Sequence, residues 1–213
     1  MTILLLHALP LDERMWEPQR SVVPDAVALR LYGRGRSMDA WAESIANELD
    51  GELVVVGASM GGYCALALAR REPERVRALL LLGARPDADP EERRERRAAT
   101  IDLIRREGPE ALWRDMLPKL FADQSVADER LLYRDPDGLV AAVEAIRDRA
   151  DSTDVARAYG NRLRFVVGEH ESFVSPGELS EFDIREIPGA GHLANLERPA
   201  EFNEQLREFL ADV

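Results

Sequence analysis

The sequence has little of what several classes of protein require. Cys64 is its only cysteine, which excludes an intramolecular disulfide and a multi-cysteine metal site. No apolar run approaches the about 18 residues of a membrane-spanning helix. The N-terminal run 3–6 is too short for a signal-peptide core, and no basic residue precedes it. We therefore expect a cytoplasmic protein.

Positive charge is also in deficit. The chain has 28 Lys and Arg residues against 40 Asp and Glu residues, a formal net charge of -12. Such a charge repels nucleic acid and anionic membrane surfaces, so neither is an expected partner. We expect a small-molecule partner and a protein that is a monomer or a homodimer.

The sequence also gives no sign of a second domain with its own hydrophobic core. A chain of 213 residues is long enough for one large α/β domain and too short for two ordinary ones. We find no repeat, linker or low-complexity segment. The prediction is a single domain over residues 1–213.

Short apolar runs alternate with amphipathic helical stretches along most of the chain. The runs predict strands at 2–6, 26–31, 53–56, 76–82, 163–167 and 184–187. Helices are expected between them, including 38–49 and a last helix that starts at Pro199. This alternation predicts an α/β fold, with a mostly parallel sheet of about six strands flanked by helices.

The alternation stops after the fourth predicted strand. From about residue 87 to residue 160 the sequence offers only helical stretches. An insertion there would lie over the carboxyl ends of the strands, where open α/β sheets bind their ligands. We interpret residues 87–160 as a helical lid.

The stretch from Gly57 to Gly61 has the pattern Gly-x-Ser-x-Gly, between a predicted strand and a predicted helix. So tight a turn holds Ser59 in a strained conformation and leaves no room for side chains at the two glycines. The serine hydroxyl then projects above the sheet as a candidate nucleophile. Beside it, the NH of Met60 at the helix N-terminus can stabilise negative charge on a substrate oxygen.

A serine nucleophile needs a base, and the chain has three histidines: His7, His170 and His192. Each follows a predicted strand. His192 lies in the glycine-rich segment 189–192, which can bend towards the serine. We predict that His192 is the general base.

The base in turn needs an acceptor that fixes its tautomer. Glu171, in the turn after the preceding strand, is the predicted acid because the chain order is then serine, acid, histidine. Glu169 is a near competitor. Asp87 and Asp89, after an earlier strand, remain open as alternatives.

His7 is followed by Ala8 and Leu9 at the end of the first predicted strand. The NH of Leu9 can supply a second donor to the oxyanion, with His7 as a buried support for that loop. The three histidines match no ligand spacing and fall on different loops, so no metal site is expected.

Together these segments resemble the α/β-hydrolase superfamily, in its cap-bearing branch of small esterases and enol-lactonase-like enzymes. The motifs that carry the resemblance are 6–10, 57–62, 168–171 and 189–192. The resemblance implies that Ser59 is the nucleophile, Glu171 the acid and His192 the base, with the NH groups of Leu9 and Met60 as the oxyanion hole. It implies no cofactor.

The chain departs from the family pattern in four places. Ala8 stands where the family usually has glycine, Glu171 where it more often has aspartate, and Leu31 where an aspartate is familiar. The first two strands of the family fold are absent from the predicted order.

The expected activity is hydrolysis of short to medium carboxylic esters through an acyl-enzyme. The predicted pocket is apolar and is lined by Trp16, Tyr63, Trp113, Met116, Leu120 and Leu193. Alternatives are a lactonase or carbon–carbon bond hydrolase with the same residues, for which Arg114 or Arg147 could bind an acid group. A small-molecule sensor with a vestigial triad is a further alternative. Ser59 excludes a nucleophilic aspartate at this position.

Overall fold

The computed structural model describes residues 1–213, apart from the side chain of Pro176. Six parallel strands form one sheet, as the sequence predicted, and their order in the sheet is β2-β1-β3-β4-β5-β6. Their bounds are β1 Thr2–Leu6, β2 Val27–Leu29, β3 Leu53–Ala58, β4 Val76–Leu82, β5 Leu163–Gly168 and β6 Asp183–Ile187. The second strand is shorter than the predicted 26–31.

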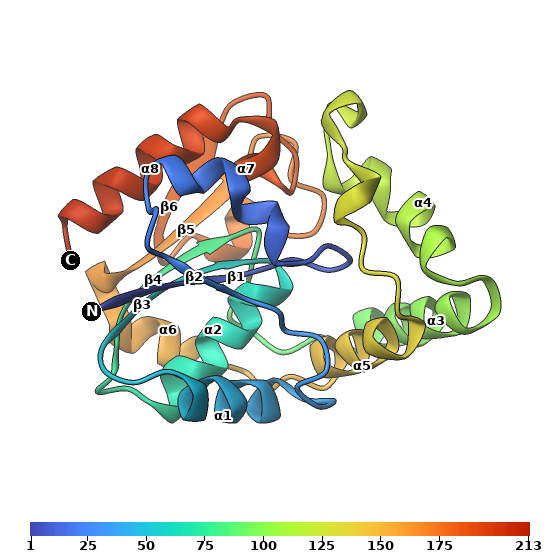
Figure 1. Cartoon of the computed structure of the whole chain (residues 1–213), viewed down its shortest axis with the longest axis horizontal. Helices are drawn as coiled ribbons and strands as arrows, with labels where there is room; N and C mark the ends of the chain where they lie inside the picture. The colour runs from blue at the N-terminus through green and yellow to red at the C-terminus, as the bar shows by residue number, and fades with distance from the viewer.

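Helices cover both faces of the sheet (Figure 1). On one face lie α1 (Met38–Glu48), α2 (Met60–Arg71) and α6 (Thr153–Tyr159). On the other lie the 3₁₀ helix η1 (Glu13–Ser21), α7 (Ala194–Glu197) and α8 (Pro199–Ala211). This is the layered arrangement that alternating strands and helices produce.

The sheet is buried on both faces because its strands carry apolar side chains at successive positions. In β3, Leu53 and Val55 pack in one hydrophobic cluster, with α1 and α2. Val54 and Val56 point the other way and pack in a second cluster, with α8. Burial of a continuous apolar run on two sides stabilises each central strand.

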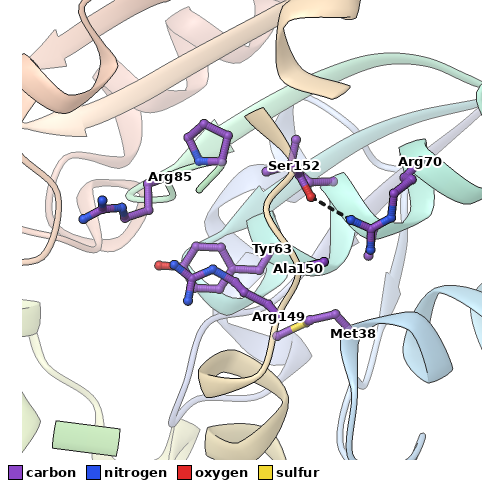
Figure 2. A pocket seen from close by; sticks show the side chains of 10 residues that line it. Met38, Tyr63, Arg70, Arg85, Arg149, Ala150 and Ser152 are labelled. Atoms are coloured by element: carbon purple, nitrogen blue, oxygen red, sulfur yellow. Dashed lines mark hydrogen bonds between the residues drawn. The ribbon is translucent and has the colours of Figure 1, made fainter. Parts of the chain in front are cut away.

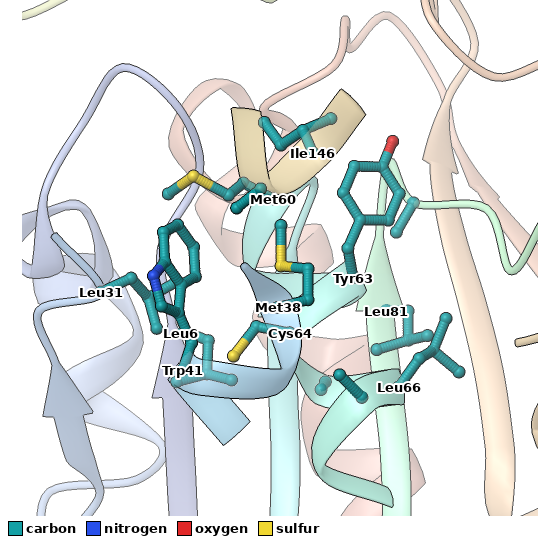
Figure 3. Packing of buried hydrophobic residues seen from close by; sticks show 14 of the residues in the cluster. Leu6, Leu31, Met38, Trp41, Met60, Tyr63, Cys64, Leu66, Leu81 and Ile146 are labelled. Atoms are coloured by element: carbon teal, nitrogen blue, oxygen red, sulfur yellow. The ribbon is translucent and has the colours of Figure 1, made fainter. Parts of the chain in front are cut away.

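The helix α2 lies at the centre of the first cluster. Figure 3 shows its side chains Met60, Tyr63 and Cys64 packed among residues of several other elements. Cys64 is fully buried, and burial raises the pKa of its thiol to about 12. Cys64 is therefore a core residue, as its apolar surroundings in the sequence indicated.

The three central strands end level with one another. Leu6 of β1 pairs with Gly57 of β3, which in turn pairs with Leu81 of β4. The loops that follow these strands therefore meet at one edge of the sheet. This edge includes the loops after β1 and β3, in which the sequence predicted functional residues.

Between β4 and β5 the chain is helical, as expected, with α3 (Glu91–Glu107), α4 (Pro109–Leu120) and α5 (Pro136–Arg147) before α6. Short 3₁₀ helices are η2 (Gln124–Val126), η3 (Glu129–Leu131), η4 (Gly160–Arg162) and, after β5, η5 (Pro176–Leu179). Figure 1 shows α3, α4 and α5 gathered beyond one end of the sheet, away from both termini. The helix α6 instead packs with α2.

None of the helices in the described part of the chain has the length and apolar character needed to cross a membrane.

Candidate active site

Ser59 occupies the turn between β3 and α2, which begins at Met60. Its backbone has φ 49° and ψ −109°, and it is the only non-glycine residue with positive φ in the described chain. A residue with a Cβ in so sparsely populated a backbone conformation costs about 1–3 kcal/mol. Such strain at an exposed loop or helix start is typical of functional sites, where the surrounding structure holds it.

Two glycines make this turn possible, as the motif predicted. A Cβ at Gly57 would lie 2.6 Å from the carbonyl of Gly61, and a Cβ at Gly61 would lie 2.1 Å from the carbonyl oxygen of Leu6. Both distances are shorter than any real contact. The turn can therefore form against β1 only with glycine at these positions.

His192 and Glu171 form a buried pair. The Nδ1 atom of His192 lies 2.8 Å from both carboxylate oxygens of Glu171. The side chains are 2% and 1% exposed respectively. Since Nδ1 faces a carboxylate acceptor, the proton of the neutral ring is held on Nδ1, which leaves Nε2 as the basic atom.

Glu171 is held as a carboxylate. Burial alone would raise its pKa, but His192 and the backbone NH groups of Phe173 and Val174 outweigh burial and lower the pKa. The Phe173 NH donates to Oε1 at 2.7 Å. The negative charge that orients the imidazole is therefore present at neutral pH.

The loop that carries His192 is fixed on both sides. The NH of Gly191 donates to Glu197 at 2.6 Å, and the NH of Leu193 donates to the carbonyl of Leu120 at 3.1 Å. A Cβ at Gly191 would lie 2.7 Å from the nitrogen of Ala122. The glycine allows the loop to approach the end of α4 closely.

Ser59 and His192 line the same small cavity, of about 10 Å³. Its other lining residues are Leu9, Tyr63, Arg97, Met116, Ile146 and Phe173. The described structure has no hydrogen bond between the Ser59 hydroxyl and His192. Such bonds are often long without substrate and tighten when it binds. The volume suffices for about one water molecule.

The first loop of the sheet brings Leu9 to this cavity. The described structure offers the NH of Leu9 no acceptor, and Met60 as first residue of α2 has none within the helix. His7 lies behind this loop and is fully buried. It accepts a hydrogen bond from the NH of Leu31 at 2.9 Å and lies 3.2 Å from the carbonyl of Ala8. Burial lowers the pKa of His7 to about 4, so it is neutral.

The alternative acids are engaged elsewhere. Glu169 accepts a hydrogen bond from the NH of Gly189 at 2.8 Å. Asp87 pairs with Arg85, and Asp89 pairs with Arg97 and Arg149. Of the carboxylates that the sequence left open, Glu171 is the one on His192.

Only some residues of the predicted pocket reach the cavity. Tyr63 and Met116 line it together with Ser59. Four others pack in the core and are not among its lining residues: Trp16, Trp113, Leu120 and Leu193. Trp16 packs on Phe202 and Trp113 on Phe121, with ring centroids 6.1 Å and 6.2 Å apart. These large apolar side chains are buried between helices and the sheet because that removes more of their surface from water.

Three lining residues were missed: Arg97, Ile146 and Phe173. The ring of Phe173 lies 4.5 Å from that of His192, between centroids. Arg97 is the cation in the cavity wall. The two arginines considered from the sequence are placed differently: Arg114 is exposed, and Arg147 pairs with Asp148.

Arg149 packs on the ring of Tyr63 (Figure 2). Its guanidinium lies 4.2 Å from the centre of the ring. Arg149 is buried, and its Nη1 lies 2.8 Å from Asp89. A cation over a buried ring stabilises the position of that ring by about 1–2 kcal/mol.

Among the described side chains, no group of three or more His, Cys, Asp or Glu is arranged to hold a metal ion.

Residues 3–205 match the model of the alpha/beta hydrolase family, and the chain belongs to this family of hydrolases. The family assignment agrees with the parallel sheet and with the turn that carries Ser59.

Solved structures support the same fold. One is a thermophilic esterase from Thermogutta terrifontis, solved with malate bound, which is 30% identical to this chain with a TM-score of 0.87. The match covers 100% of this chain and 90% of the esterase chain. The enol-lactonase from Burkholderia xenovorans LB400 is 23% identical, with a TM-score of 0.79. That match covers 98% of this chain and 90% of the enol-lactonase chain.

A curated relative is similar over a shorter stretch. The pimeloyl-[acyl-carrier protein] methyl ester esterase of Aromatoleum aromaticum is 34% identical over 93 residues. The match spans 39% of this chain and 37% of that protein.

Proposed function

We propose that the protein is a carboxylesterase-like serine hydrolase that cleaves small to medium carboxylic esters through an acyl-enzyme. Ser59 is the nucleophile, His192 the general base and Glu171 the acid. The NH groups of Leu9 and Met60 form the oxyanion hole. Membership of a hydrolase family and the esterases among the relatives support this proposal.

The reaction follows from these roles. Ser59 attacks the ester carbonyl while His192 Nε2 takes the hydroxyl proton, and the oxyanion accepts hydrogen bonds from Leu9 and Met60. The proton then passes to the leaving alcohol, and an acyl-enzyme forms. Water deprotonated by His192 attacks the acyl group, and the acid is released with Ser59 restored.

One observation carries the proposal. A nearly buried imidazole has its Nδ1 2.8 Å from a carboxylate, and its ring lines the same cavity as a serine with φ 49°. General base catalysis on a serine needs a base near the hydroxyl and an acceptor that orients the base, and these residues supply both.

Turnover of a chromogenic short-chain ester, such as p-nitrophenyl acetate, tests the proposal. Ser59→Ala should abolish turnover above the background rate, and Ser180→Ala is the matched control. Ser180 is exposed and lines neither the cavity that holds Ser59 nor the groove beside it, so it should tolerate the change. Equal activity of Ser59→Ala and wild type would reject the mechanism.

Lactone hydrolysis is a second candidate, because a lactone is a cyclic ester and Arg97 places a cation in the cavity wall. A ligand library that includes lactones distinguishes the two activities. Tight binding of a ligand with negligible turnover would instead favour a sensor. The cytoplasmic location expected from the sequence stays a prediction.

A further inference from the structure

A groove of about 330 Å³ adjoins the cavity at Ser59. The groove and the cavity share four lining residues: Leu9, Arg97, Met116 and Phe173. A substrate whose ester lies at Ser59 can therefore extend along this wall into the groove. The groove is larger than the space at the serine and can hold the remote part of such a substrate.

The remainder of the groove is basic. Arg93, Arg96 and Arg97 of α3 line it with Lys119 of α4, against one carboxylate, Asp115. The chain as a whole has the opposite balance, with 40 acidic and 28 basic residues. Cations that line one concave surface can attract anions even in an acidic protein.

Arg97 is the cation nearest the chemistry, since it lines both the cavity and the groove. Its side chain is 18% exposed. Within the described structure its hydrogen bond runs from Nε to Asp89 at 3.1 Å, which leaves both terminal amino groups without a protein acceptor. A guanidinium held in this way presents donors for a carboxylate.

The nearby acids leave positive charge in excess at Arg97. The side chain of Asp89 is fully buried and is shared between Arg97 and Arg149, so one carboxylate faces two guanidinium groups. The outer cations have acidic partners: Arg96 pairs with Glu92, Lys119 with Asp115 at 2.9 Å, and Arg93 with Glu178 at 3.6 Å. Ion pairs at the surface are weak in water, so these cations can exchange their partners for a substrate carboxylate.

We propose that the groove binds a carboxylate on the substrate, so that the preferred substrates are esters with an anionic group beyond the scissile bond. This inference rests on the proposed ester hydrolysis at Ser59. Arg97 binds the carboxylate at the inner end of the groove, and Arg93, Arg96 and Lys119 attract it from solution.

The experiment compares pairs of esters that differ only in charge. Monomethyl succinate, glutarate and adipate are each paired with the ester in which a primary amide replaces the free carboxylate. We expect kcat/KM for the best acid to exceed that for its amide by about 10- to 100-fold, the range of a charge-assisted hydrogen bond. The preference should shrink at high salt, because the outer cations are exposed.

Arg97→Gln should reduce the preference for the acid by about tenfold. Arg106→Gln is the matched control, because Arg106 lies on the same helix, is exposed and does not line the groove. A double variant of the exposed residues, Arg96→Gln with Lys119→Gln, keeps the proposal testable should loss of Arg97 unfold the chain. It should lower the preference by about threefold and weaken its salt dependence.

The outcomes separate the two proposals. Equal kcat/KM for acids and amides, with turnover that depends on Ser59, overturns the carboxylate site alone. If no ester is hydrolysed, the proposed activity is wrong. The carboxylate site is then tested separately, by calorimetric titration of Ser59→Ala with monomethyl adipate and with its amide. Tighter binding of monomethyl adipate than of its amide, lost in Arg97→Gln, supports the site; equal or absent binding overturns it.

Discussion

The Nδ1 atom of His192 lies 2.8 Å from each carboxylate oxygen of Glu171. A ring nitrogen held by two oxygens restricts rotation of the imidazole and leaves Nε2 outside this pair. Phe173 holds the same pair twice, through its NH to Glu171 and its ring against His192. The acid is therefore set in place by the turn after β5 as well as by its partner.

Glu171→Gln should reduce kcat/KM by about 10³- to 10⁴-fold, because an amide neither stabilises the imidazolium nor fixes the reactive tautomer. Glu169→Gln is the control, since Glu169 bonds Gly189 rather than His192. It should stay within about threefold of wild type. Steady-state kinetics on one ester decide the matter, and equal losses in the two variants would remove the special role of Glu171.

Protonation of His7 should destabilise the fold. The pKa of His7 is lowered from 6.5 to about 4, so between these pH values the unfolded chain binds a proton that the folded chain does not. Stability is then full above pH 6.5 and falls by about 3 kcal/mol as the pH drops towards 4. Urea unfolding of wild type and His7→Gln over this pH range measures how much of the change in the free energy of unfolding comes from His7.

The glutamine variant keeps an acceptor for the NH of Leu31 and should show a flatter pH dependence. His170→Gln is the control because His170 is exposed, and its profile should follow wild type. Parallel profiles for all three proteins would contradict the assignment of this pH dependence to His7.

Gly83→Ala should displace the pair formed by His192 and Glu171. A Cβ at Gly83 would lie 2.7 Å from the His192 ring and 3.1 Å from Glu171. Gly160→Ala is matched in backbone, with φ 53° against φ 58°, and has open space around its Cβ. Both variants should lose about 1–2 kcal/mol of stability from the positive φ.

Only Gly83→Ala should also lose activity, by about 100-fold or more, because an imidazole displaced by about 1 Å is out of position to take the proton of Ser59. Thermal unfolding and kcat/KM are measured on the same samples. Full activity in Gly83→Ala would show that the ring is not held where the structure places it.

Met116→Ala should widen the space at Ser59, which now holds about one water. We expect kcat/KM for hexanoate esters to rise by about tenfold relative to acetate, since each added methylene contributes about 0.8 kcal/mol on burial. Leu117→Ala on the same helix is the control, because Leu117 packs on the core and does not line the cavity. An unchanged ratio would place the acyl group elsewhere.

Much of the fold is predictable because the strands are apolar runs buried on both faces. The site motifs are predictable for a related reason: Gly57 and Gly61 are required by contacts that no other residue allows. The choice between Glu171 and Glu169 depends on which way two side chains of one turn point, and the sequence does not specify that direction.

The lining of the cavity was harder to predict because it depends on how α3, α4 and α5 pack together. Met116 and Trp113 lie one turn apart on α4, yet Met116 reaches the cavity and Trp113 the core. Arg97 lies on a helix that is charged on most sides, so no apolar stripe indicated which of its residues faces inward.

The most direct test of the account is covalent labelling with a fluorophosphonate followed by peptide mapping. A serine activated by His192 displaces fluoride and retains the phosphonyl group. We expect a single adduct on Ser59 in the wild type and none in His192→Ala or Ser59→Ala. Labelling of another serine, or labelling of Ser59 that persists in His192→Ala, would contradict the proposed nucleophile and base.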